Sequence, residues 1–148
     1  SSGTYQIKLN SASSKNFQLD LTTITQRGDS KTETIKGVVN SQGQVLNLTF
    51  DKSNINNSHI KKSVTFASTL EDIAMLKKLG SISFPVAIST TVLISDAEKM
   101  YNKGKHDQAN KLIDAAIVLI EKTPKILINP TAKDILLYDF AALKKLIK

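Results

Sequence analysis

The sequence predicts an α+β protein, in which an N-terminal antiparallel β-meander or sandwich packs with a C-terminal part of three to four helices. Composition changes near residue 68, because Ser, Thr and Asn supply 26 of the first 68 residues but only 12 of the last 80. Apolar spacing changes there too, from alternating to helical. We therefore expect a β-rich subdomain over residues 1–68 and a helical subdomain over 69–148, either separate or sharing one core.

The first subdomain is predicted to hold four or five strands. Apolar residues alternate with polar ones in several short runs, as in half-buried strands, and turn-forming residues separate the runs. The runs contain Tyr5, Ile7 and Leu9; Phe17, Leu19 and Leu21; Val45 or Leu46, Leu48 and Phe50; and Val64 and Phe66. A sheet this small buries little area, so we expect the helices to cover it.

The helices are expected to begin at Thr69. Thr69 is a suitable N-cap because Glu71 and Asp72 follow it in the first turn, and Gly80 would end this short helix after two lysines. The next segment, residues 82–94, has two interpretations. It fits either a strand or the start of a long helix with Pro85 in its first turn, and we favour the helix.

Residues 92–122 read as two helices joined by a tight turn. Leu93, Ala97 and Met100 repeat at one-turn intervals, and Gly104 can take the left-handed conformation that ends a helix. The apolar face of the second helix is then formed by Ala109, Leu112, Ile113, Ala116, Ile117 and Ile120.

These small residues and the turn glycine over residues 90–123 resemble a single tetratricopeptide-type hairpin, a repeat of about 34 residues. Met100 stands where that family usually has an aromatic residue, and Pro124 comes a few residues later than the repeat's terminal proline. An ordinary helical hairpin explains the same spacing equally well. The resemblance implies a surface that binds protein rather than one that carries reacting groups.

A last helix is predicted after residue 129. Asn129 or Thr131 would cap it, and Pro130 suits its first position. Its apolar face is formed by Leu136, Phe140, Leu143 and Ile147.

Charge is distributed evenly. The net charge is +7, of which +4 falls in residues 1–68 and +3 in residues 69–148. No basic arm is present, and aromatic residues are not interleaved with basic ones, so nucleic-acid binding through this diffuse charge is not favoured. No apolar stretch reaches the roughly 20 residues that a membrane helix requires.

The sequence offers no pattern for catalysis, cofactor binding or metal binding. It contains no cysteine and two histidines, His59 and His106, neither in a metal-ligand spacing. It has no paired carboxylates on one helical face, no phosphate-binding glycine loop and no nucleophile elbow. We therefore expect no catalytic residue, no cofactor and no metal.

The function expected from these observations is a non-enzymatic protein-binding or assembly module. We predict that Met100, Tyr101, His106 and Asn110 line its binding face, because they cluster at the hairpin turn outside the main apolar stripe. The alternative is a small-ligand carrier or hydrolase with a pocket between sheet and helices.

The expected location is outside the cytoplasm, in the periplasm or attached to a membrane, as part of a bacterial envelope complex. The small polar start Ser1-Ser2-Gly3 fits a removed signal peptide or a lost lipid anchor, and it fits the remnant of a tag equally well. The strand-rich composition that follows favours export, although a cytoplasmic protein can have it too.

Overall fold

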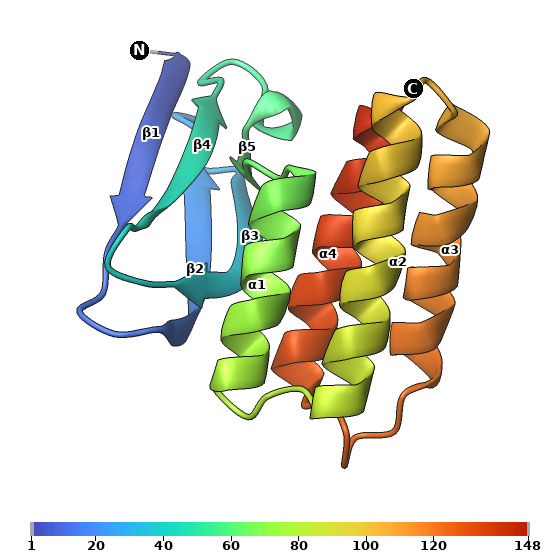
Figure 1. Ribbon diagram of the computed structural model, residues 1–148. Coiled ribbons are helices and arrows are strands. Elements are labelled where there is room, and N and C mark those ends of the chain that lie inside the picture. The colour runs from blue at the N-terminus through green and yellow to red at the C-terminus, as the bar shows by residue number, and fades with distance from the viewer. Residues whose placement is uncertain (1, 148) are drawn as a thin grey trace. The chain divides into compact units, whose positions relative to one another are not determined.

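The computed structural model describes residues 2–147, so Ser1 and Lys148 lie outside the described residues. The chain forms two compact units, which we call the β unit, ending at Ser63, and the helical unit, starting at Val64. Strands fill the first and four helices the second (Figure 1). The predicted α+β class is therefore confirmed.

The β unit contains two antiparallel sheets. Strand β1 (Gly3–Leu9) pairs with β4 (Gln44–Phe50), which pairs with β5 (His59–Lys62), while β2 (Lys15–Ile24) pairs with β3 (Ser30–Val39). The strands do not follow a simple meander, since Tyr5 of β1 lies opposite Leu48 of β4 rather than opposite a residue of β2.

The core of the β unit is built from alternate residues of all five strands. Ile35, Leu46 and Ile60 are buried at its centre. Partly buried apolar side chains pack against them, namely Ile7, Leu9, Phe17, Leu19, Leu21 and Leu48. Alternation thus predicted the inward faces of β1, β2 and β4 correctly, except that Tyr5, expected on the inward face of β1, is exposed.

The predicted last strand and first helix were both misplaced. The residues around Val64 and Phe66 are not a strand, because helix α1 runs from Phe66 to Lys78 and Thr65 is its N-cap. The Thr65 hydroxyl accepts a hydrogen bond from the Ser68 amide at 3.1 Å, and the Ser68 hydroxyl accepts one from the Thr65 amide at 2.9 Å. This reciprocal capping box fixes the start four residues earlier than Thr69, which is buried inside the helix.

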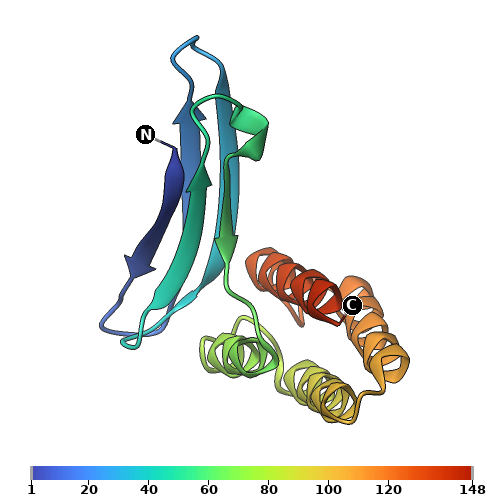
Figure 2. The ribbon, with the colours of Figure 1, turned by 90° about the horizontal axis from the view of Figure 1, so that it is seen from above.

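The helical unit continues with α2 (Phe84–Asn102), α3 (His106–Lys122) and α4 (Pro130–Leu146). Each helix packs against the next, and α4 also packs against α1, as the view from above shows (Figure 2). Residues 84–94 are therefore helical, as favoured. The Asn129 side chain accepts a hydrogen bond from the Ala132 amide at 2.7 Å, which confirms it as the cap of α4.

Two glycines end helices as the sequence predicts. Gly80 and Gly104 have φ angles of 68° and 71°, in the left-handed region that side chains with a Cβ disfavour. After Gly104, the Lys105 amide donates a hydrogen bond to the Met100 carbonyl at 2.9 Å. This bond satisfies one of the carbonyl groups at the C-terminal end of α2. Helices α2 and α3 pack against each other, and their small residues Ala97, Ala109 and Ala116 are fully buried.

Candidate functional site

The four residues predicted to bind protein lie in the last turn of α2 and the first two turns of α3. The Tyr101 and His106 rings stack, with centroids 5.3 Å apart and an interplanar angle of 24°. Tyr101 also lies against Phe66 at the start of α1, with a centroid distance of 5.6 Å. His106 is exposed, whereas Met100, Tyr101 and Asn110 are half-buried. The structure thus joins Tyr101 and His106 in one aromatic stack.

Asn110 has an unusual environment within this turn region. Its side-chain oxygen Oδ1 is shielded from solvent and accepts no hydrogen bond from the residues that the structure describes. A buried acceptor without a donor costs free energy, about 1–3 kcal/mol in proteins. The turn itself forms an open hollow of about 370 Å³, lined by Gly104, Lys105, His106, Asp107 and Gln108. The turn therefore offers mainly polar groups.

A second surface, which sequence reasoning missed, lies between α1 and α2. We call it the groove; its volume is about 250 Å³, and it is lined by Leu70, Ile73, Ala74, Lys77, Ala87, Ile88, Thr91 and Val92. Ile88 and Val92 lie one helical turn apart on its α2 side, and 45% and 53% of their surface is exposed. Lys77 is the one charged residue in the lining.

The groove exists because α2 is apolar on two sides. One side is buried and consists of Val86, Ala87, Thr90, Ile94 and Ala97. The other side carries the exposed residues Phe84, Ile88 and Val92, at positions i, i+4 and i+8. An ordinary surface helix has only one apolar stripe, so the second stripe has no function in the core of the helical unit.

The signal for the groove was present in the sequence. Phe84, Ile88 and Val92 have helical spacing, but this becomes visible only once residues 84–94 are assigned to a helix. The same apolar run also fits a buried strand, and periodicity alone does not separate the two for a short run. A helix was favoured for this run, but spacing does not show which of its apolar sides the fold leaves exposed, so the surface was not predicted.

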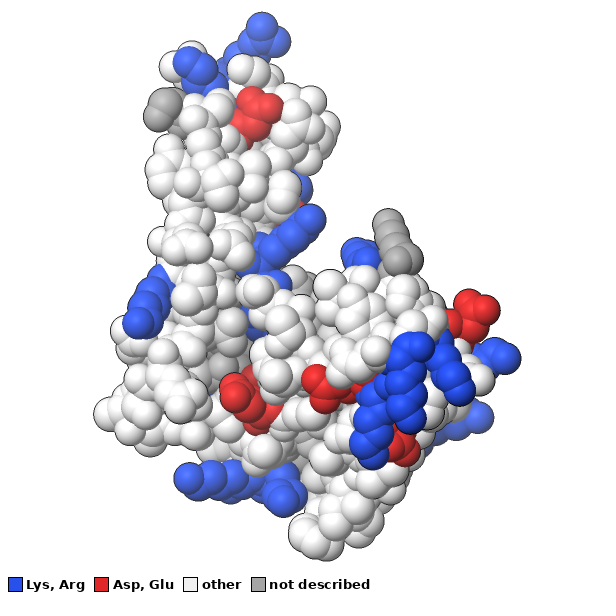
Figure 3. All heavy atoms as spheres, turned by 45° about the horizontal axis from the view of Figure 1, so that its top comes forward, with Lys and Arg blue, Asp and Glu red and all other residues white. Residues whose placement is uncertain are grey.

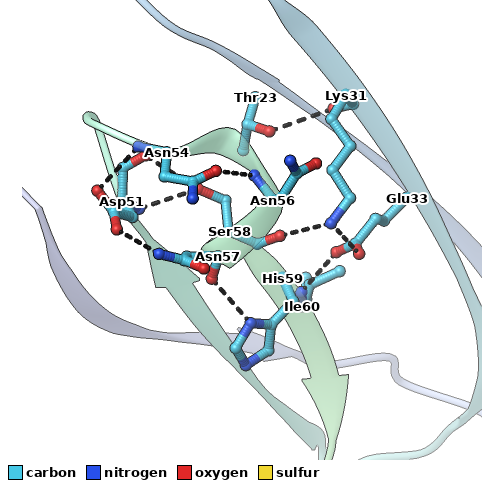
Figure 4. A network of polar contacts seen from close by, with 10 residues as sticks. All are labelled: Thr23, Lys31, Glu33, Asp51, Asn54, Asn56, Asn57, Ser58, His59 and Ile60. Carbon is cyan, nitrogen blue, oxygen red and sulfur yellow. Dashed lines mark hydrogen bonds and ion pairs between the residues drawn. The ribbon is translucent and has the colours of Figure 1, made fainter.

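The β unit carries a polar network at the loop before β5 (Figure 4). Lys31 of β3 donates a hydrogen bond to the Ser58 carbonyl at 2.8 Å, and Glu33 accepts one from the Ile60 amide at 2.8 Å. Lys31 and Glu33 also form an ion pair with an N–O distance of 2.9 Å. Side chains of β3 thus bind the backbone in and just before β5, although β3 and β5 belong to different sheets and form no backbone pairing with each other. We interpret this network as structural.

Within the same loop, Asp51 acts as a local organiser. One carboxylate oxygen accepts hydrogen bonds from the Ser53 and Asn54 amides, and the other accepts one from the Asn57 side chain at 2.9 Å. These bonds, that from Asn57 first, lower the pKa of Asp51 below its ordinary value. Both carboxylate oxygens of Asp51 therefore accept hydrogen bonds from residues of the loop itself.

Acid is expected to weaken the β unit through Glu33. Partial burial raises the pKa of Glu33, but the hydrogen bonds from Lys31 and the Ile60 amide outweigh this effect and hold the pKa below its ordinary value. A carboxyl group whose pKa is lower in the folded than in the unfolded chain stabilises the fold at pH values above the unfolded-state pKa. This stabilisation is lost as the pH falls through the folded-state pKa. Glu33→Gln should therefore cost about 1 kcal/mol at neutral pH and less at an acidic pH below the folded-state pKa of Glu33.

Urea unfolding at both pH values measures this difference, with exchange of the Ile60 amide as a local probe. Glu71→Gln, an exposed change in α1, is the control and should shift stability by less than about 0.5 kcal/mol at either pH. An equal cost of Glu33→Gln at both pH values would contradict the assigned role of the carboxylate.

Charge and metal-binding groups add no further candidate. The visible face in Figure 3 carries Lys and Arg side chains in several separate groups, with fewer Asp and Glu. Among residues 2–147, no group of three or more His, Asp or Glu is placed to hold a metal ion. None of the four helices in this part of the chain is long and apolar enough to cross a bilayer.

The groove and the α2–α3 turn therefore remain as the two candidate surfaces, one apolar and one polar and aromatic. The likeness of α2 and α3 to one tetratricopeptide hairpin rests on their residues and spacing. Comparison of the chain with known protein families, with curated proteins and with solved structures finds no match.

Proposed function

We propose that this chain is a non-enzymatic protein-binding or assembly module, and that its groove docks an amphipathic helix of a partner protein. The observation that carries the proposal is the second apolar stripe of α2, which lies beside α1 and leaves Ile88 and Val92 half exposed. Two packed helices present a furrow along their length, and a third helix can place apolar side chains in such a furrow.

The same proposal includes export from the cytoplasm and the lack of a catalytic role. The polar, strand-rich composition of the β unit supports export and a place in a bacterial envelope complex. We assign the protein no catalytic role, because the polar clusters described above are used in capping, in turns and in the network before β5. Lys77 in the groove lining favours a partner helix with acidic residues beside its apolar stripe.

The test begins with the full chain in its source cells. A photo-crosslinking amino acid at position 88 should capture one discrete partner, and the same group at position 118 should not. Val118 is a matched control, because it is an aliphatic residue on α3 with 45% of its surface exposed, outside the groove. The captured protein is then identified and purified.

Direct affinity measurements with the purified partner decide between the two surfaces. Val92→Glu places a charge in the groove and is expected to weaken binding about 30-fold or more, as for an interface hot spot. Val118→Glu should change the affinity less than about threefold. If binding survives Val92→Glu but is lost in the double variant Met100→Glu with Tyr101→Ala, the partner binds the turn instead of the groove. If every variant binds like the wild type, the proposal fails.

A further inference from the structure

The two loops at one end of the helical unit form a single exposed structure, which we call the tip. One loop joins α1 to α2 (residues 79–83) and the other joins α3 to α4 (residues 123–129), and both lie at the same end of the helices (Figure 1). An antiparallel bridge pairs Ile82 with Ile128. The Ser83 amide donates to the Leu127 carbonyl at 2.7 Å, and the Asn129 amide donates to the Ser81 carbonyl at 2.9 Å.

This bridge sorts the apolar residues of the tip into two sets. Ile82 and Ile128 are buried beneath the bridge and anchor both loops. Ile126 and Phe84 remain outside, with 90% and 63% of their surface exposed, and Leu79 and Leu127 are exposed as well. Ile126 is the most exposed large apolar residue in the described part of the chain. Such a concentration of exposed apolar side chains marks a surface that leaves water on binding.

Charge at the tip is mainly positive. The two loops contain Lys125 and no Asp or Glu, and the helix ends that lead into them carry Lys77, Lys78 and Lys122 against one acidic residue, Glu121. Lys77 and Lys125 line the hollow of about 560 Å³ between the loops, together with Phe84, Ile126 and Leu127. The Lys77 Nζ lies 5.5 Å from the centre of the Phe84 ring. Lys77 and Lys125 can thus lay their aliphatic stems along apolar neighbours and keep their ammonium groups at the rim.

We propose that the tip docks this protein onto an anionic phospholipid bilayer. Ile126 and Phe84 enter the boundary between headgroups and acyl chains, while the lysines in and beside the two loops contact the anionic headgroups, the division typical of interfacial membrane anchors. A bilayer rather than a protein is the occupant that fits. Ile126 projects at a loop apex, where a protein partner must supply a matching pocket, whereas a bilayer accepts an apolar side chain without shape complementarity.

This proposal concerns a surface other than the groove and stands without the proposed protein partner. The groove residues Ile88 and Val92 do not line the tip hollow, although Lys77 lines both. Val92→Glu is therefore expected to leave lipid binding within about threefold of the wild type, as is the matched surface variant Val118→Glu.

The test uses the full chain and large vesicles of two compositions, phosphatidylcholine alone and phosphatidylcholine mixed with phosphatidylglycerol. Sedimentation should show binding to the mixed vesicles only, falling as salt is added. Lys125→Gln and Lys77→Gln should each weaken binding about fivefold, the effect of removing one cation near an anionic surface. Ile126→Glu should weaken it about 30-fold or more, because it adds a negative charge and removes the most exposed apolar side chain.

Insertion can be observed directly, because the chain contains no tryptophan. The variant Ile126→Trp should show a blue-shifted emission on mixed vesicles and quenching by brominated lipid, whereas Val118→Trp should show neither. Absence of binding to mixed vesicles, or equal binding by Ile126→Glu and Val118→Glu, would overturn the proposal. The proposal would also be overturned if the vesicles sediment the Ile126→Trp variant but its tryptophan emission is not shifted. Such a result would leave only diffuse electrostatic attraction to the vesicle surface.

Discussion

Phe140→Ala is expected to destabilise the helical unit by about 3–5 kcal/mol, the usual cost of removing a fully buried phenylalanine. Phe140 lies in the middle of α4, is completely buried and is the largest fully buried side chain of the described chain. Because α4 packs against both α3 and α1, a cavity at this position removes contacts that hold the four helices together. Urea unfolding followed by helical circular dichroism measures the loss.

Leu146→Ala is the matched control in the same helix, because Leu146 is exposed. We expect its effect to stay below about 0.5 kcal/mol. A cost of Phe140→Ala as small as that of the control would mean that α4 is not docked in solution as described.

Leu46→Ala is expected to have an effect of similar size in the β unit, about 2–5 kcal/mol. Leu46 is fully buried on β4, the central strand of the three-stranded sheet, and belongs to the cluster with Ile35 and Ile60. Amide hydrogen exchange shows whether the loss of stability falls on the β unit, because protection of the amides in β1, β4 and β5 should decrease most.

Ile24→Ala is the control for this second prediction, since Ile24 is an exposed residue at the end of β2. Its amide exchange and global stability should remain close to those of the wild type. If Leu46→Ala changes exchange no more than Ile24→Ala does, the proposed core between the two sheets does not hold the β unit together.

The sequence was most informative where one residue type has one physical explanation. Asn129 before Pro130 predicted the start of α4, and the glycine at position 104 predicted the end of α2, because few other residues suit those backbone positions. The start of α1 was harder to predict. Thr65 and Thr69 are both acceptable caps, and only the exchange of hydrogen bonds between Thr65 and Ser68 selects the first.

Strand partners and the candidate surfaces could not be predicted in the same way. Alternation indicates which face of a strand is buried, but it does not indicate which strand lies beside it, so the pairing of β1 with β4 was not foreseen. The groove and the tip depend on which apolar side chains the fold leaves uncovered. Sequence spacing identifies apolar stripes, and only packing decides that Val86 is buried while Ile88 is exposed.

The pairing of β1 with β4 also affects the order in which the β unit forms during synthesis. Strand β1 is made before its partner, and the complete β2–β3 hairpin lies between the two in the chain. The hairpin closes a short loop, whereas joining Leu9 to Gln44 closes a long one at a greater entropic cost. Until β4 has left the ribosome, Ile7 and Leu9 therefore lack their strand partner and stay exposed, although β1 was made first.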